Sequence, residues 1–129
     1  MNLLIDTHIF LWAINEDPRL TGVRLRLFRD PGNTLYLSMA SVWEVFLKAS
    51  TGKLVLKGGE PESFVRQQME LNRIQLLPIR LEHTAQVVRL PWHHKDPFDR
   101  LLIAQSQLEK LPLLTVDGWF AAYDVELVG

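Results

Sequence analysis

The sequence contains no cysteine, no long hydrophobic run and no excess of basic residues. Without cysteine, the chain can form neither disulfides nor thiolate metal ligands. No apolar run approaches the roughly 20 residues that a membrane helix needs. The N-terminus meets an acid at Asp6 and has neither the basic start nor the apolar stretch of a secretory signal. We therefore expect a cytoplasmic protein without a membrane partner.

The charge balance argues against binding nucleic acid through bulk electrostatics. The chain has 14 Lys and Arg against 15 Asp and Glu, a net charge of −1, whereas nucleic-acid-binding proteins usually have a basic excess. If RNA is the substrate, the basic residues must be clustered and metal must mask some of the acids. The glycines at 52, 58 and 59 match no phosphate-binding loop.

The 129 residues, 47% of them hydrophobic, are enough for one domain with a buried core. Hydrophobic periodicity predicts short strands that alternate with helices. We expect strands over 3–5, 34–38, 74–79, 113–116 and 125–128, and helices over 7–15, 20–30, 40–50, 62–71, 81–90 and 98–110. This alternation is typical of an α/β fold whose central, mainly parallel sheet of four to five strands is flanked by helices.

Four carboxylates fall where such a sheet would place a site. Asp6 and Asp117 follow the first and fourth expected strands, Glu44 lies in the helix after the second, and Asp99 opens the helix over 98–110. Sites in parallel sheets form beyond the carboxyl ends of the strands, so we expect these acids to converge. Clustered anions raise one another's pKa unless a cation is present. Oxygen ligands of this kind favour Mg²⁺ or Mn²⁺.

Each acid also has a structural explanation. Asp6 could cap the helix that begins after it, and Asp117 could be a turn residue. Asp96 and Asp99 fit the N-cap and N3 positions of a helix, which is the interpretation we prefer for Asp96. Glu44 could lie on a solvated helix face, although its neighbours are apolar. The joint placement of the four acids is a stronger argument for a site than any one of them.

Basic residues flank the segment that contains Asp99. His93, His94, Lys95 and Arg100 are the best local candidates for phosphate contacts. The alternative for the two histidines is an exposed loop, and metal ligation by both is disfavoured because adjacent histidines rarely face one ion. Arg100 could instead lie on the helix surface or pair with an acid.

The four tryptophans allow two interpretations. Trp12 and Trp43 occur among apolar residues at helical spacing, and we interpret both as core residues. Trp92 and Trp119 could stack on bases, but we favour packing in the core for both.

Four segments together are similar to one protein family. Leu4–His8, Ser41–Val45, Asp96–Ala104 and Leu114–Asp117 occur in the order and spacing of PIN domains, and the Asp-Pro-Phe-Asp-Arg run resembles the VapC-like branch. The resemblance spans essentially the whole chain and implies a PIN-like three-layer sandwich. It also implies a metal-binding quartet of Asp6, Glu44, Asp99 and Asp117, with Thr115 holding a water or a neighbouring carboxylate.

The resemblance further implies an activity and partners. The implied protein is a Mg²⁺-dependent endoribonuclease, with Mn²⁺ as a substitute, that cuts structured RNA such as tRNA or rRNA. It is a homodimer and the toxin of a VapBC-type toxin–antitoxin pair, inhibited by a cognate VapB-type antitoxin. The alternative is a non-catalytic PIN-like module that binds RNA or a protein without cutting.

Two other families of acidic α/β proteins do not fit. A haloacid-dehalogenase-type phosphatase needs a second Asp two positions after the first, where this chain has His8. A receiver domain needs a phospho-accepting Asp after the third strand, where 78–80 are Pro-Ile-Arg.

Overall fold

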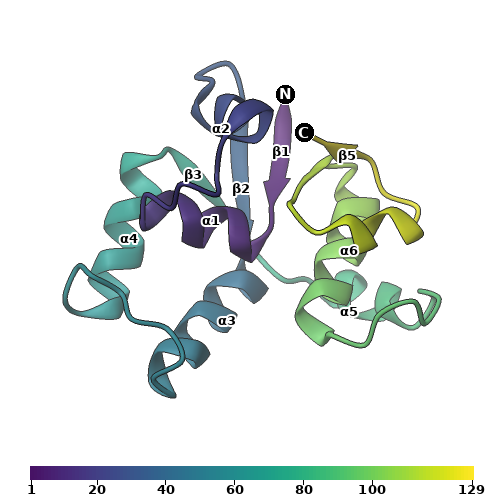
Figure 1. Ribbon diagram of the computed structural model, residues 1–129. Coiled ribbons are helices and arrows are strands. Elements are labelled where there is room, and N and C mark those ends of the chain that lie inside the picture. The colour runs from purple at the N-terminus through teal and green to yellow at the C-terminus, as the bar shows by residue number, and fades with distance from the viewer.

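The computed structural model describes residues 1–129, with a five-stranded sheet at its centre (Figure 1). All neighbouring strands pair in parallel, in the order β3-β2-β1-β4-β5. The strands are β1 (Asn2–Ile5), β2 (Thr34–Ser38), β3 (Ile74–Leu77), β4 (Leu113–Leu114) and β5 (Leu127–Val128). The helices are α1 (Thr7–Ile14), α2 (Gly22–Arg29), α3 (Met39–Ser50), α4 (Pro61–Leu71), α5 (Leu81–Val87), α6 (Pro97–Glu109) and the 3₁₀ helix η1 (Gly118–Ala122). The predicted α/β class and parallel sheet are confirmed.

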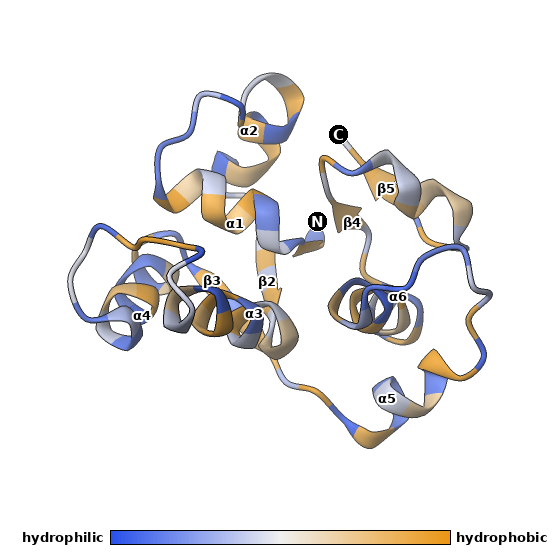
Figure 2. Cartoon of the chain, turned by 60° about the horizontal axis from the view of Figure 1, so that its bottom comes forward, coloured by the Kyte–Doolittle hydropathy of each residue, from blue (hydrophilic) through white to orange (hydrophobic).

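Other elements cover both faces of the sheet, and successive side chains of a strand point to opposite faces, so each strand contributes to two hydrophobic clusters. In β1, Leu3 and Ile5 belong to one hydrophobic cluster and Leu4 belongs to the other. The first cluster includes residues of α1, α2, α3 and α4, whereas the second includes residues of α6 and the C-terminal segment. Figure 2 shows that α1 and α3 combine hydrophobic and hydrophilic residues, as expected for helices that cover one face of a sheet.

The carboxyl ends of β1 and β2 lead directly into helices. Asp6 separates β1 from α1, and Ser38 ends β2 while its hydroxyl caps α3 by accepting the N–H of Ala40 at 3.0 Å. As a result, α1, α3 and α6 lie around the carboxyl end of β1 (Figure 1). None of the helices combines the length and the apolar character that a membrane span requires.

The structure differs from the sequence-based expectations at element ends and at two tryptophans. The strands after α4 and α6 are shorter than expected, since β3 ends at Leu77 and β4 at Leu114. Trp43 and Trp92 are exposed, so the prediction that they pack in the core is wrong. Trp43 lies edge-on to Phe98, and Trp92 covers a buried arginine. Trp12 and Trp119 pack against the two hydrophobic clusters, as predicted.

Candidate functional site

Four acidic side chains from four parts of the chain meet at the carboxyl edge of the sheet. Asp6 follows β1, Glu44 lies in α3, Asp99 lies in the first turn of α6, and Asp117 precedes η1. Burial, which has the largest effect, and the charges of Asp96, Glu44, Asp6 and Asp117 together raise the pKa of Asp99 to about 8. Asp99 is therefore close enough to the other three acids to be affected by their charges.

Asp6 is the most deeply buried of the four, with 2% of its surface exposed. One carboxylate oxygen accepts the backbone N–H of Ile9 at 2.8 Å, so Asp6 caps α1. The other oxygen accepts the hydroxyl of Thr115. Burial raises the pKa of Asp6 despite these two hydrogen bonds. Asp6 therefore both caps α1 and belongs to the acidic cluster.

Glu44 is held by groups from its own helix and from α1. The hydroxyl of Thr7 donates to Glu44 Oε1 at 2.8 Å, and Lys48 Nζ lies 3.1 Å from Glu44 Oε2, one turn further along α3. The Thr7 hydroxyl also lies 2.9 Å from that of Ser41. These contacts fix the Glu44 carboxylate without removing it from the cluster.

The ligand atoms form two groups that each include a histidine. Asp6, His8 and Asp117 offer ligand atoms that all lie within 4.8 Å of one another, and His94, Asp96 and Asp99 do the same. Within them, His8 Nδ1 lies 3.2 Å from Asp117 Oδ2, and His94 Nε2 lies 3.3 Å from Asp99 Oδ2. Glu44 belongs to neither group.

This donor set fits a divalent cation. Carboxylate oxygens are the ligands of Mg²⁺ and Mn²⁺, and imidazole is a further ligand for transition metals. Burial raises the pKa of both Asp6 and Asp99, and a cation between the acids would stabilise their charged forms. Both groups offer at least two carboxylates, so either could contribute to binding.

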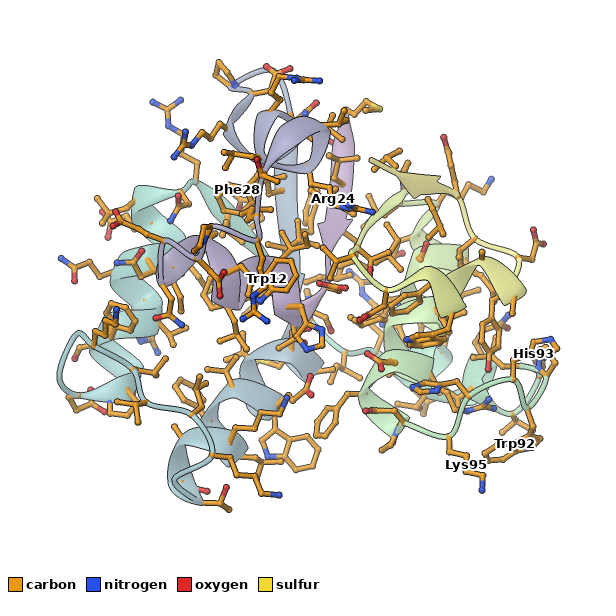
Figure 3. The ribbon with its side chains drawn as sticks, viewed as in Figure 1. Trp12, Arg24, Phe28, Trp92, His93 and Lys95 are labelled. Atoms are coloured by element: carbon orange, nitrogen blue, oxygen red, sulfur yellow. The ribbon has the colours of Figure 1, made fainter.

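The predicted phosphate-binding residues of the loop before α6 differ in their exposure and in their neighbours. His93 and Lys95 are exposed, and the ring of His93 packs edge-on against Tyr123. The ring of His94 lies over Trp119, 3.7 Å between centroids, and faces Asp99. The two adjacent histidines therefore point to different neighbours, and only His94 reaches the acidic cluster. Figure 3 shows His93 and Lys95 at the outer part of this loop.

Arg100 is buried, so the prediction that it contacts phosphate is wrong. Only 3% of its surface is exposed. Its guanidinium donates to carbonyl oxygens of the chain that precedes it, lies 4.1 Å from the ring centroid of Trp92, and pairs with no acid. The carbonyls belong to Val87, Leu90, Pro91 and His94. Arg100 thus anchors the loop that carries His94.

Sequence reasoning missed three residues of the site: Thr7, His8 and Lys48. His8 lies in the first turn of α1, two positions after Asp6. Its position close to the carboxyl end of β1 could have identified it as a site residue from the sequence. Lys48 follows Glu44 by four residues, the spacing of side chains that face each other on a helix. The contact of Thr7 with Glu44 joins α1 to α3 and had no signal along the chain.

An acidic cluster at the carboxyl edge of an all-parallel, helix-covered sheet defines the class of this protein. The family model of the PIN domain matches residues 3–126, and the chain belongs to the PIN domain family. No curated protein sequence matches it.

Solved structures share the fold over nearly their whole length. VapBC2 from Rickettsia felis, bound to a DNA fragment from its promoter, has a TM-score of 0.73 at 18% identity, with 100% of this chain and 98% of that chain covered. VapBC-1 from nontypeable Haemophilus influenzae has a TM-score of 0.69 at 16% identity, covering 99% and 97%. FitAcB from Neisseria gonorrhoeae has a TM-score of 0.66 at 20% identity, covering 100% and 97%.

Proposed function

We propose that this chain is a metal-dependent endoribonuclease that hydrolyses phosphodiester bonds of RNA. The observation that supports it best is the convergence of four carboxylates, which with burial holds the pKa of Asp99 at about 8. A protein that only binds RNA has no need of four converging anions. Membership of the PIN family and a fold shared with VapBC structures support the same function.

Asp6, Glu44, Asp99 and Asp117 are the proposed ligands of Mg²⁺, or of Mn²⁺ in its place. When bound, such an ion lowers the pKa of a water and neutralises charge on a phosphate. The chain's own part is to hold the ligands in position. Thr115 orients Asp6 and Thr7 orients Glu44, while His8 and His94 contact Asp117 and Asp99.

The distribution of basic residues supports RNA as the substrate despite the net charge of −1. Residues 18–29 contain four arginines and 48–57 contain three lysines, and neither segment contains an acid. Both segments reach the site, since Arg24 donates to the carbonyl of Thr115 at 2.9 Å and Lys48 pairs with Glu44. On the other side, the exposed His93 and Lys95 are the proposed phosphate contacts. Structured RNA such as tRNA or rRNA is the substrate we propose.

A VapB-type antitoxin is the proposed protein partner, in a VapBC-type pair in the cytoplasm. The similar structures from Rickettsia felis and Haemophilus influenzae are named as VapBC. In this chain α1, α2 and α4 border a cavity of about 520 Å³, whose lining combines apolar side chains, among them Trp12 and Phe28 (labelled in Figure 3), with polar ones such as Arg29 and Gln68. An amphipathic helix of a partner could place its apolar face there.

A homodimer is also part of the proposal. Leu81, Val88 and Trp92 are large apolar side chains that are largely exposed around α5. Exposed apolar patches commonly mark contacts with another protein. Light scattering of the purified protein at several concentrations would measure its mass.

A non-catalytic module that binds RNA or protein is the second candidate. Two observations favour it: both oxygens of Asp6 already accept hydrogen bonds, and the ligand atoms form two groups rather than one. Such a module would bind without metal-dependent cleavage.

The decisive experiment is incubation of the purified protein with total tRNA and a panel of structured RNAs, with Mg²⁺, Mn²⁺ or EDTA. The variants are Asp6→Asn and Asp99→Asn, with the exposed Asp124→Asn as the control for loss of one negative charge. We expect cleavage by wild type and Asp124→Asn only with metal, and none by the two site variants. Binding without cleavage, from folded wild-type protein free of inhibitor, would favour the second candidate. Wild-type activity in Asp6→Asn or Asp99→Asn would contradict the metal-ligand assignment.

A further inference from the structure

A second cavity, of about 480 Å³, opens directly beside the acidic cluster. Its lining includes Asp117 and His8 of the cluster, and Trp12, Asp17 and Arg19 from α1 and the segment after it. The volume lies within the roughly 300–1,000 Å³ typical of small-molecule sites. A ligand group in this cavity would therefore be a direct neighbour of whatever the acids bind.

The wall of this cavity contains the guanidinium of Arg19, which Asp17 contacts at its edge and Trp12 contacts on one face. Arg19 Nε lies 3.1 Å from both carboxylate oxygens of Asp17, and Arg19 Nη2 lies 2.7 Å from Asp17 Oδ2. Beneath the guanidinium, the ring centroid of Trp12 lies 4.7 Å from Arg19 Cζ. Trp12, which Figure 3 labels on α1, is itself packed against the core.

One face of this guanidinium remains free. The Arg19 side chain is 67% exposed although Trp12 covers one side and Asp17 binds its edge. A guanidinium plane held flat in this way is a stacking surface, because unpaired bases of RNA stack on aromatic rings and on arginine planes. Because Asp17 and Trp12 already order the Arg19 side chain, binding a base would cost little further side-chain entropy.

We propose that this cavity is a nucleobase subsite, in which one unpaired base of an RNA strand stacks on Arg19 while its neighbouring phosphate lies at the acidic cluster. The proposal rests on the proposed ribonuclease function and names the substrate feature that the site selects. Unpaired bases next to the cleaved bond are favoured, because a base inside a duplex cannot present its face to Arg19.

Basic segments beside the cavity agree with a strand of nucleic acid at this position, whereas the two acids in the lining are Asp17, which pairs with Arg19, and Asp117 of the acidic cluster. Leu54, which lies between Lys53 and Lys57, also lines the cavity. The cavity is therefore bordered by the two basic segments, 18–29 and 48–57. Phosphates on either side of the stacked base would find cations there.

Two variants test the stacking surface against a matched control. Arg19→Lys keeps the charge but removes the plane, and Trp12→Leu removes the ring under it while keeping an apolar side chain. Arg66→Lys is the control, because Arg66 pairs with Glu62 at 2.9 Å, is 78% exposed and has no aromatic ring beneath it. Circular dichroism of each variant confirms that it is folded.

Binding is measured by fluorescence anisotropy with single-stranded RNA decamers, either intact or with one abasic nucleotide at each position in turn. Every protein in this assay carries Asp99→Asn so that the RNA is not consumed. We expect Arg19→Lys and Trp12→Leu to weaken binding of intact RNA by on the order of tenfold. At one position, an abasic nucleotide should weaken RNA binding by the Asp99→Asn protein by the same factor. In the protein that also carries Arg19→Lys, the abasic nucleotide should cause no further loss of binding.

Cleavage assays without Asp99→Asn separate the subsite from the nuclease. If RNA is cleaved but Arg19→Lys binds every decamer as the Arg66→Lys control does, the subsite is overturned and the nuclease stands. If no RNA is cleaved but the abasic position and Arg19→Lys still show the shared loss, the nuclease fails and the subsite stands. A cavity that instead receives a segment of a protein partner would show no abasic dependence, which also overturns the subsite.

Discussion

The hydroxyl of Thr115 links Asp6 to Asp117. It donates to the Asp6 carboxylate and accepts the backbone N–H of Asp117 at 3.0 Å. Asp6 follows β1 and Asp117 lies beyond β4, and these strands are neighbours in the sheet. A single buried oxygen thus sets the relative position of two acids that the chain separates by more than a hundred residues.

Replacing Thr115 by Val should weaken metal binding and cleavage while the protein remains folded. Val has the same shape but leaves one oxygen of the Asp6 carboxylate and the N–H of Asp117 without a partner, so we expect a loss of about 1–2 kcal/mol in unfolding free energy. Calorimetric titration with Mn²⁺ should show affinity lowered by about tenfold. Thr115→Ser, which retains the hydroxyl, should restore most of it. Equal Mn²⁺ affinity in Thr115→Val and wild type would contradict the positioning role.

Asp99→Asn should stabilise the metal-free protein, and more so as the pH rises. In the unfolded chain Asp99 ionises near its ordinary pKa of 3.8, whereas in the folded protein its pKa is about 8. Below pH 3.8 both states keep the proton. Between about pH 4 and 8 the folded state retains a proton that the unfolded state releases, so stability falls as the pH rises.

The measurement is urea unfolding in EDTA at pH 5, 6.5 and 8. Each pKa unit corresponds to about 1.4 kcal/mol, but the side chain is 22% exposed and solvent screens the effect. We therefore expect Asp99→Asn to be about 1–2 kcal/mol more stable than wild type at pH 8, with a smaller difference at pH 5. Added Mg²⁺ should stabilise wild type and should have less effect on the variant. Destabilisation of Asp99→Asn at pH 8 in EDTA would contradict this account.

The adjacent histidines His93 and His94 should respond differently to replacement by alanine. The ring of His94 lies 3.3 Å from Asp99, whereas that of His93 packs on Tyr123 away from the acids. We expect His94→Ala to lower Mn²⁺ affinity and cleavage by about tenfold, as is usual for removal of a group that orients a ligand. His93→Ala, the matched control, should leave Mn²⁺ affinity unchanged. The reverse order of effects would show that the loop adopts another arrangement.

Arg100 should matter for stability rather than for RNA binding. Its replacement by Met removes the donors of several partly buried carbonyls and a buried charge that they stabilise, so we expect a loss of about 2–4 kcal/mol. Arg89, which is exposed and bonds only to Gln86, provides the control, and Arg89→Met should change stability by less than about 0.5 kcal/mol. Denaturant titration of both variants gives the comparison. If Arg100→Met unfolds like wild type but releases RNA, the residue binds phosphate after all.

The sequence by itself determined the fold class and the edge of the sheet on which the acids lie. Strands and helices alternate because the hydrophobic residues change from continuous runs to helical spacing along the chain. The structure has the same alternation. The position of Asp6 after β1 and of Glu44 in α3 followed from it. The N-cap interpretation of Asp96 was also confirmed, since its carboxylate accepts the N–H of Phe98 at 2.8 Å. Capping depends only on neighbouring residues, so sequence suffices.

Only the tertiary structure decided the surroundings of each charged or aromatic side chain. Arg100 is buried because the chain from Val87 to His94 folds over it and turns its carbonyls inward, which no spacing indicates. Trp43 is exposed although its neighbours Val42 and Val45 are buried, because which face of α3 meets the sheet depends on the whole packing. The pairs His8 with Asp117 and Thr115 with Asp6 each join residues far apart in sequence. Hydrophobic periodicity is a local property of the chain, whereas burial and pairing are properties of the assembled layers.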